Sequence, residues 1–165
     1  MAAPTLTIHP VTDNTGSPLV GSQISTLDFG NVQAGYWSDA KAIIIRFSGN
    51  TVNSLKLWLN DTVSTGANTD VSTGNGWSHY YNIDSSWQDP DAITDLMKAG
   101  TNVDLNGNTW VQIDESEPGS SNFETDTTTT DPEDSDYIYL SISPDSGAGA
   151  GVTTDWSLRA SYLYP

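Results

Sequence analysis

Apolar and polar residues alternate with a period of two in most apolar stretches of this chain. In residues 137–143 (YIYLSIS), Ile138, Leu140 and Ile142 share one face, and residues 156–164 (WSLRASYLY) alternate in the same way. This is the period of a strand with one buried face, whereas residues 42–47 (AIIIRF) form the continuous apolar run expected of a central strand covered on both faces. Several such strands separated by turn residues predict an all-β fold, an antiparallel β-sandwich of seven to nine strands.

Helical periodicity is confined to one segment. Residues 90–99 (PDAITDLMKA) follow Asp89, a residue suited to an N-cap, and end before Gly100, so they predict one short helix. Elsewhere turn residues separate the strands. The alternation that begins at Thr5 breaks at Pro10, and the pair Asn106-Gly107 predicts a type I′ hairpin between residues 103–105 and 110–113.

Charge limits the possible partners. The chain carries 21 acidic and 5 basic side chains, a formal net charge of −16. Phosphate would repel such a chain, so nucleic acid and anionic membranes are poor partners. Residues 1–83 have a net charge of only −2, and residues 114–136 alone hold nine acids and no base. A segment of that composition predicts a long, solvated acidic loop.

Cysteine is absent, which excludes disulfides and thiolate metal sites. Residues 1–10 (MAAPTLTIHP) have neither the basic start nor the apolar stretch of a signal peptide, and no apolar run reaches 18 residues. We therefore expect a protein that is made in the cytoplasm of its host without a signal peptide.

Two stretches resemble immunoglobulin-like domains. Residues 27–35 (LDFGNVQAG), followed by KAIIIRF and LKLWL, resemble the opening of hydin-type domains, through Phe29, Gly30, Val32 and Gly35. Residues 137–162 are similar to the last hairpin of many bacterial and phage immunoglobulin-like domains. The resemblance implies that Phe29 closes the end of a sandwich, while Gly30 and Gly35 take backbone angles that other residues resist.

The same resemblance implies an organisation and a function. We expect an extended N-terminal arm over residues 1–22 and one immunoglobulin-like domain over residues 23–165. Cysteine-free domains of this kind look like phage virion proteins, above all capsid decoration (cement) proteins. The expected partners are the major capsid protein, other virion proteins and further copies of the chain, with a trimer favoured, and the expected location is the virion. The arm would contact the shell while the acidic half faces solvent.

The chain is predicted not to be an enzyme and to use no cofactor. Only His9 and His79 could serve as a base at neutral pH, and no Gly-x-Ser-x-Gly, phosphate-binding loop or His-Glu-x-x-His motif occurs. Calcium is an open alternative at two places. Asp104, Asn106 and Asn108 have the spacing of a calcium loop, although a plain hairpin is favoured there. The second place is a cluster of four acids that are weak calcium candidates, namely Asp131, Glu133, Asp134 and Asp136.

Aromatic residues supply the alternative function. Six Trp and seven Tyr are present, and five aromatic or imidazole side chains cluster between turn signals, namely Trp77, His79, Tyr80, Tyr81 and Trp87. If exposed, they would form a platform for stacking sugars or anchoring a partner, as in a carbohydrate-binding or adhesin module. If buried, they would close one side of the sandwich.

Overall fold

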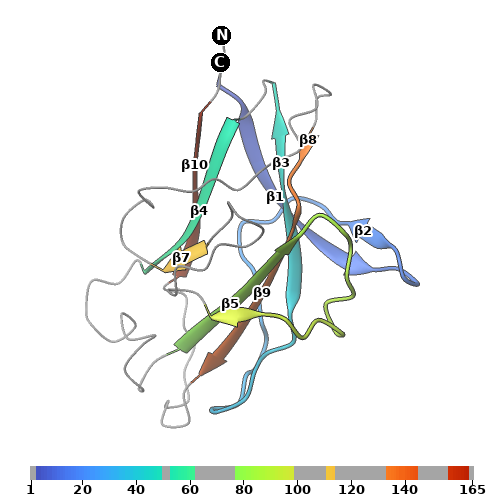
Figure 1. Cartoon of the computed structure of the whole chain (residues 1–165), viewed down its shortest axis with the longest axis vertical. Helices are drawn as coiled ribbons and strands as arrows, with labels where there is room; N and C mark the ends of the chain where they lie inside the picture. The colour runs from blue at the N-terminus through green and yellow to red at the C-terminus, as the bar shows by residue number, and fades with distance from the viewer. Residues whose placement is uncertain are drawn as a thin grey trace.

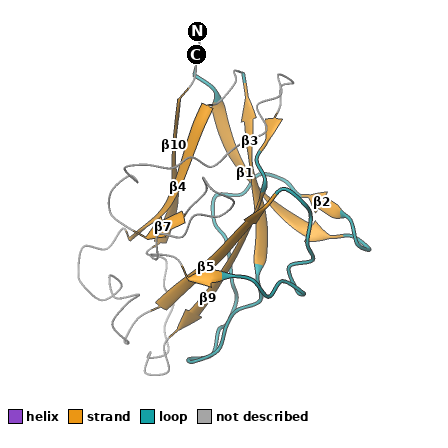
Figure 2. Cartoon of the chain, in the orientation of Figure 1, coloured by secondary structure: helices purple, strands orange, loops and turns teal. Residues whose placement is uncertain are grey.

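The computed structural model describes residues 3–49, 53–61, 77–98, 111–113, 133–144 and 156–163. Every regular element in these ranges is a β-strand (Figure 2). In chain order the strands are β1 (Thr5–Asp13), β2 (Pro18–Val20), β3 (Lys41–Ser48), β4 (Asn53–Asp61), β5 (Trp77–Asp84), β6 (Met97–Lys98), β7 (Val111–Ile113), β8 (Glu133–Asp134), β9 (Tyr137–Pro144) and β10 (Trp156–Leu163). In these ranges no helix has the length and apolar character needed to cross a membrane. The prediction of an all-β fold is therefore confirmed for the part described.

The main sheet has the order β2-β1-β3-β9-β5-β6, and β8 also pairs with β3. All of its pairings are antiparallel (Figure 1). A second group of strands has the order β10-β4-β7, in which β4 pairs antiparallel with β10 and parallel with β7. Of the type I′ hairpin predicted around Asn106-Gly107, only β7 is described, and its expected partner, residues 103–105, lies outside the described residues.

Strand β3 is at the centre of the core. Ala42 and Ile44 are each 2% exposed on one face, and so are Ile43 and Ile45 on the other. Both faces of this strand are therefore covered, as its unbroken apolar run predicted. In β9, Ile138, Leu140 and Ile142 are buried as expected, but so are Tyr139 and Ser141 on the opposite face. The expectation that this strand buries only one face is therefore wrong, because β9 lies inside the main sheet with cover on both sides.

Strands β8 and β9 continue one another with a one-residue irregularity between them. Two residues lie between Ile43 and Arg46 on β3, whereas three lie between their partners Ile138 and Asp134. The extra residue has the character of a β-bulge. Buried Ser135 restores the lost ladder bond, because its Oγ accepts from Ile45 N at 2.9 Å and its own N–H donates to Ile45 O at 2.8 Å. Residues 133–135 therefore belong to the sheet, so the expectation of a loop over residues 114–136 is wrong for them, and residues 114–132 lie outside the described residues.

The helix expected over residues 90–99 is wrong for residues 90–98. Asp89 Oδ1 accepts from the N–H of Asp91 at 3.0 Å, and Ala92 N donates to Asp89 O at 2.9 Å, which makes a turn. The chain then enters β6, which pairs with Tyr80 and Tyr81. Asp before Pro serves turns as well as helix starts. Packing decides the outcome, because Ile93 and Leu96 lie against the buried cluster around Tyr139.

The expectation of an extended N-terminal arm over residues 1–22 is wrong for residues 5–13, which form β1 and pair with β3 from Thr5 to Val11. Proline 10 does not end this strand. On one side of β1, Pro10 pairs with Ile43 of β3. On the other side, β2 ends at Val20, which pairs with Val11. The missing proline N–H would face Gly21, the residue after β2, and not β3, so proline leaves the β1–β3 ladder intact.

Candidate functional site

Of the five residues proposed as an aromatic platform, the structure describes the side chain of one, Trp87. Trp77, His79, Tyr80 and Tyr81 belong to β5, which pairs with β9 over its whole length, and their side chains lie outside the described residues. Trp87 is described and is a packing residue. Its ring meets Tyr137 edge-on at 5.3 Å between centroids and lies 6.1 Å from Tyr139.

Trp87 also ties the loop after β5 to the first hairpin of the chain. Its Nε1 donates to Asp13 Oδ1 at 3.3 Å, and the Asp13 carboxylate accepts from Gly16 N at 3.1 Å. Trp87 packs, with Ile93, Leu96, Val20 and Tyr137, on the buried cluster of Val11, Ala42, Ile44 and Tyr139. It therefore closes one side of the main sheet, which is the second of the two alternatives left open by the sequence.

Tyr139 lies beneath this cover and is 0% exposed. Its hydroxyl accepts a hydrogen bond from Gln88 N at 2.7 Å. Burial raises the pKa of Tyr139 to about 12, an effect that the Gln88 bond partly offsets and the nearby Asp84 carboxylate reinforces. The phenol is therefore a neutral packing group at physiological pH.

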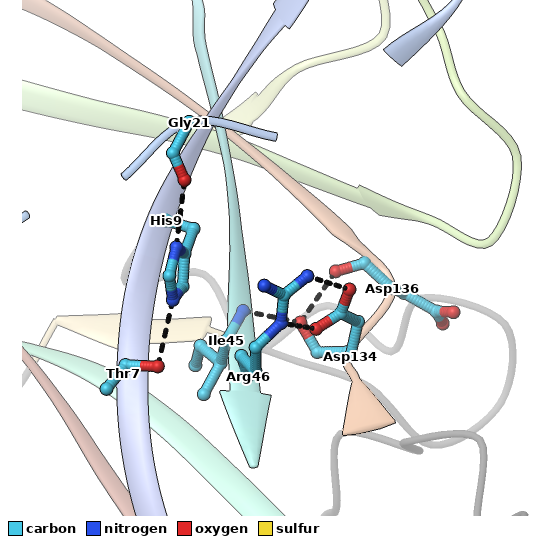
Figure 3. A network of polar contacts seen from close by, with 8 residues as sticks. Thr7, His9, Gly21, Ile45, Arg46, Asp134 and Asp136 are labelled. Atoms are coloured by element: carbon cyan, nitrogen blue, oxygen red, sulfur yellow. Dashed lines mark hydrogen bonds and ion pairs between the residues drawn. The ribbon is translucent and has the colours of Figure 1, made fainter. Parts of the chain in front are cut away.

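His9 takes part in the polar network of Figure 3. A carbonyl can only accept, so the contact of 2.9 Å between His9 Nδ1 and Gly21 O places a proton on Nδ1. In the neutral ring Nε2 then accepts from the Thr7 hydroxyl at 2.9 Å. A hydroxyl bonded to an imidazole is the first element of nucleophilic catalysis, which also needs a donor for the developing oxyanion.

Arg46, opposite Thr7 in the sheet, would be the nearest cationic donor along that register. Its guanidinium is committed elsewhere, because Nε and NH2 donate to the two carboxylate oxygens of Asp134 at 2.6 and 2.8 Å (Figure 3). This bond raises the pKa of Arg46 above its ordinary value. His9 thus ties β1 to Gly21, and Arg46 separately ties β3 to Asp134 of β8.

The same ion pair bears on the calcium candidates. Asp134 is bound to Arg46, and Ser135 Oγ donates to the backbone carbonyl of Asp136 at 2.8 Å. Asp131 and the side chain of Glu133 lie outside the described residues, as do Asp104, Asn106 and Asn108. Within the described ranges, no group of three or more His, Asp or Glu side chains is placed to hold a metal ion.

The turn motif of the sequence is fully described. Gly30 and Gly35 have φ values of 69° and 80°, the left-handed conformation expected of them. Asp28 Oδ1 accepts from Gly30 N at 2.7 Å. Phe29 and Val32 are half-buried. The bond from Tyr36 N to Gln33 O, at 3.0 Å, closes a turn with Gly35 at its third position, where a type II turn requires positive φ.

Two exposed aromatic residues follow directly, and sequence reasoning missed them. Tyr36 is 62% exposed and Trp37 is 51% exposed, and with Leu19 at 54% they are the large hydrophobic residues exposed in the described part. Neither lies in an alternating stretch, so periodicity gave no signal. A Tyr-Trp pair directly after a glycine turn, outside any strand pattern, is the feature that could have identified them. We call residues 33–38 the aromatic turn.

Hydrogen bonds to the end of β9 hold the aromatic turn in place. Gly35 N donates to Pro144 O at 2.7 Å, and Ser38 N donates to Ile142 O at 2.8 Å. Ser38 Oγ accepts from Ile142 N at 3.0 Å, and Ser141 Oγ donates back to Ser38 O at 3.0 Å. The two aromatic residues thus stand on a backbone fixed at both ends, which is the main requirement for a preorganised contact.

Comparison with known proteins gives no identification. No family model matches the chain, and searches of the curated proteins and of the solved structures find no match.

Proposed function

We propose that the chain is an immunoglobulin-like β-sandwich that serves as a structural virion protein, most specifically a capsid decoration protein that binds the outside of a phage-type shell. The burial of β3 on both faces supports a layered fold, because each face needs its own cover. Trp87 and its neighbours supply one cover, and the group β10-β4-β7 is a candidate for the other.

One observation carries the functional part of the proposal, namely the hairpin formed by β2 and the end of β1. Figure 1 shows it extending away from the rest of the main sheet, and residues 12–19 are all exposed. Leu19, 54% exposed, gives it an apolar contact. The bond from Trp87 to Asp13 braces the hairpin against the body. A braced, protruding element suits a protein that works by contact with a partner.

The outer edge of this hairpin is protected against strand addition. Thr12 pairs with Leu19, so the backbone groups of Pro18 and Val20 face away from β1. Proline has no N–H, and β2 has only three residues, two features that discourage pairing with another sheet. The hairpin would therefore bind through side chains, with the major capsid protein or another virion protein as partner.

Charge supports an arrangement of many copies. Fourteen of the sixteen net negative charges fall in residues 84–165, so the half that contains the hairpin is nearly neutral. An acidic, solvent-facing half keeps crowded copies from aggregating. We include self-association, with a trimer favoured, in the proposal.

The test uses phage particles whose genome encodes the chain but which are produced with the gene for the chain deleted, so that the particles lack the protein. Purified protein should co-sediment with these particles, and Leu19→Asp should reduce binding at least tenfold, because it places a charge in the apolar contact. Ser85→Asp, on an exposed residue of the loop after β5, is the matched control and should bind normally. Equal binding of all three proteins would refute the hairpin contact, and no binding by the wild type would refute the decoration role.

For the alternative function, a carbohydrate-binding or adhesin module, we propose a different binding site from the one expected from the sequence. Trp87 packs on the core, so the platform first considered loses that member. Among the residues whose side chains the structure describes, the exposed aromatic ones are Tyr36 and Trp37, and a sugar site there is compatible with shell binding by the hairpin.

A further inference from the structure

We propose that the aromatic turn is a binding site for a neutral oligosaccharide, separate from the hairpin that would contact the shell. Tyr36 and Trp37 are consecutive, and both are more than half exposed. Adjacent exposed aromatic side chains are a common feature of ligand-binding surfaces. Their rings offer the flat apolar surface and the polar atom that suit the C–H face and hydroxyls of a sugar.

The backbone of this site is rigid before any ligand arrives. Main-chain bonds from Gly35 and Ser38 attach the turn to β9, and the reciprocal bonds between Ser38 and Ser141 link residues 103 positions apart in the chain. Binding would therefore cost little ordering of the backbone, which matters for sugars because their individual contacts are weak.

Polar side chains surround the two rings in the sequence. Asn31, Gln33 and Asp39 are all exposed, and they precede or follow the rings by a few residues on the same turn-rich segment. Amide groups donate and accept, and carboxylates accept, in the fixed directions that sugar hydroxyls require. The combination of aromatic surface and planar polar groups is what a neutral, hydroxyl-rich ligand needs.

Charge argues against a cationic ligand at this position. Asp39 is two positions from Lys41 in the sequence, and residues 1–83 together have a net charge of only −2. The concentrated negative potential that would draw a cation therefore lies in the other half of the sequence.

Size argues against a protein partner at this position. A standard protein interface buries about 800 Å² on each side, whereas an aromatic residue contributes about 150–250 Å² when fully buried. Leu19, the other large hydrophobic residue exposed in the described part, belongs to β2 and not to this turn. Two rings fit a ligand of one to three sugar units.

The experiment screens the wild-type protein on an array of neutral and acidic glycans and titrates the best neutral binder by NMR. Tyr36→Ala and Trp37→Ala should each weaken binding at least tenfold, while Tyr36→Phe and Trp37→Phe should retain most of it because they keep the stacking surface. Leu19→Ala, at the exposed residue of the hairpin, is the control and should bind like the wild type.

The outcomes separate this site from the decoration role. No neutral glycan bound by the wild type, or equal binding by both alanine variants, would overturn the sugar site and leave shell co-sedimentation untouched. Preference for acidic glycans or for a basic peptide would also overturn it. Loss of glycan binding in the alanine variants with normal shell binding would establish two separate surfaces.

Discussion

The His9 side chain occupies the place of a backbone hydrogen bond that Pro10 cannot make with Gly21. Gly21 N donates to Pro10 O at 2.8 Å, the half of a reciprocal pair that proline permits. The other half would require a proline N–H, and His9 Nδ1 donates to Gly21 O at 2.9 Å instead. A Cβ on Gly21 would come within 3.0 Å of the Pro10 ring, so glycine allows this close approach.

The substitution of a side chain for a backbone donor predicts coupling between His9 and Pro10. His9→Ala should cost about 1 kcal/mol of unfolding free energy, because the Gly21 carbonyl loses its donor. In a Pro10→Ala background the restored N–H can reach that carbonyl, so the same change should cost about 0.5 kcal/mol less. Denaturant unfolding of the four proteins measures the difference. Additive effects would contradict the explanation, and Thr7→Val controls for the loss of the Thr7–His9 bond.

The bulge between β8 and β9 depends on a single hydroxyl. Ser135→Ala leaves the buried Ile45 N–H without its acceptor and should lower stability by about 1–3 kcal/mol. Hydrogen exchange should show faster exchange of the Ile45 amide in particular. Ser85→Ala, on an exposed serine, should change stability by less than about 0.5 kcal/mol. If the two variants were equally stable, the bulge would not rely on Ser135.

Tyr139 should make stability fall at high pH. Its pKa is raised to about 12 in the folded protein, whereas the phenol of an unfolded chain ionises near pH 10. The contribution is therefore complete below about pH 10 and is lost as pH rises toward 12, because only the unfolded state releases the proton in that window. Urea unfolding of wild type and Tyr139→Phe from pH 8 to 11.5 tests this. The wild type should lose stability more steeply above pH 10, and parallel curves would contradict the assignment.

The first hairpin contains a residue with a strained backbone, and a substitution can relieve this strain. Thr15 has a φ of 54° beside Gly16 at 85°, and bonds between Asn14 and Ser17 close the two-residue turn. Positive φ at both central positions defines a type I′ turn, which favours Asn-Gly and penalises β-branched residues. Thr15→Asn should stabilise the protein by about 0.5–1 kcal/mol, and Gly16→Ala should destabilise it. A loss of stability in Thr15→Asn would show that another contact selects threonine.

The sequence predicted those strands whose pattern is local. Residues 42–47 form an unbroken apolar run and residues 137–143 alternate, so β3 and β9 followed from side-chain order alone. The helix prediction failed because Asp89 and Pro90 serve a turn as well as a helix start, and the packing of Ile93 against the core decided between them. Continuation of β1 through Pro10 depends on Gly21, a partner that no local pattern reveals.

The candidate site was not predictable for a related reason. Trp87 stood in an aromatic cluster by sequence but lies against Tyr137, whose position depends on the pairing of β9. Tyr36 and Trp37 are exposed on a turn that Ser141 holds through Ser38, a contact between distant parts of the chain. Exposure is a property of the assembled fold, so a composition rich in aromatic residues could not say which of them face solvent.

The most direct test of the account measures how much of the chain is present in phage particles purified on a density gradient, from the phage whose genome encodes it. A decoration protein should remain with intact particles, with a copy number comparable to that of the shell subunits or of the symmetry axes of the shell. Particles that lack the protein should break at a lower temperature. If the chain were found only in the unbound fraction, and particles without it were equally stable, the proposed role would be contradicted.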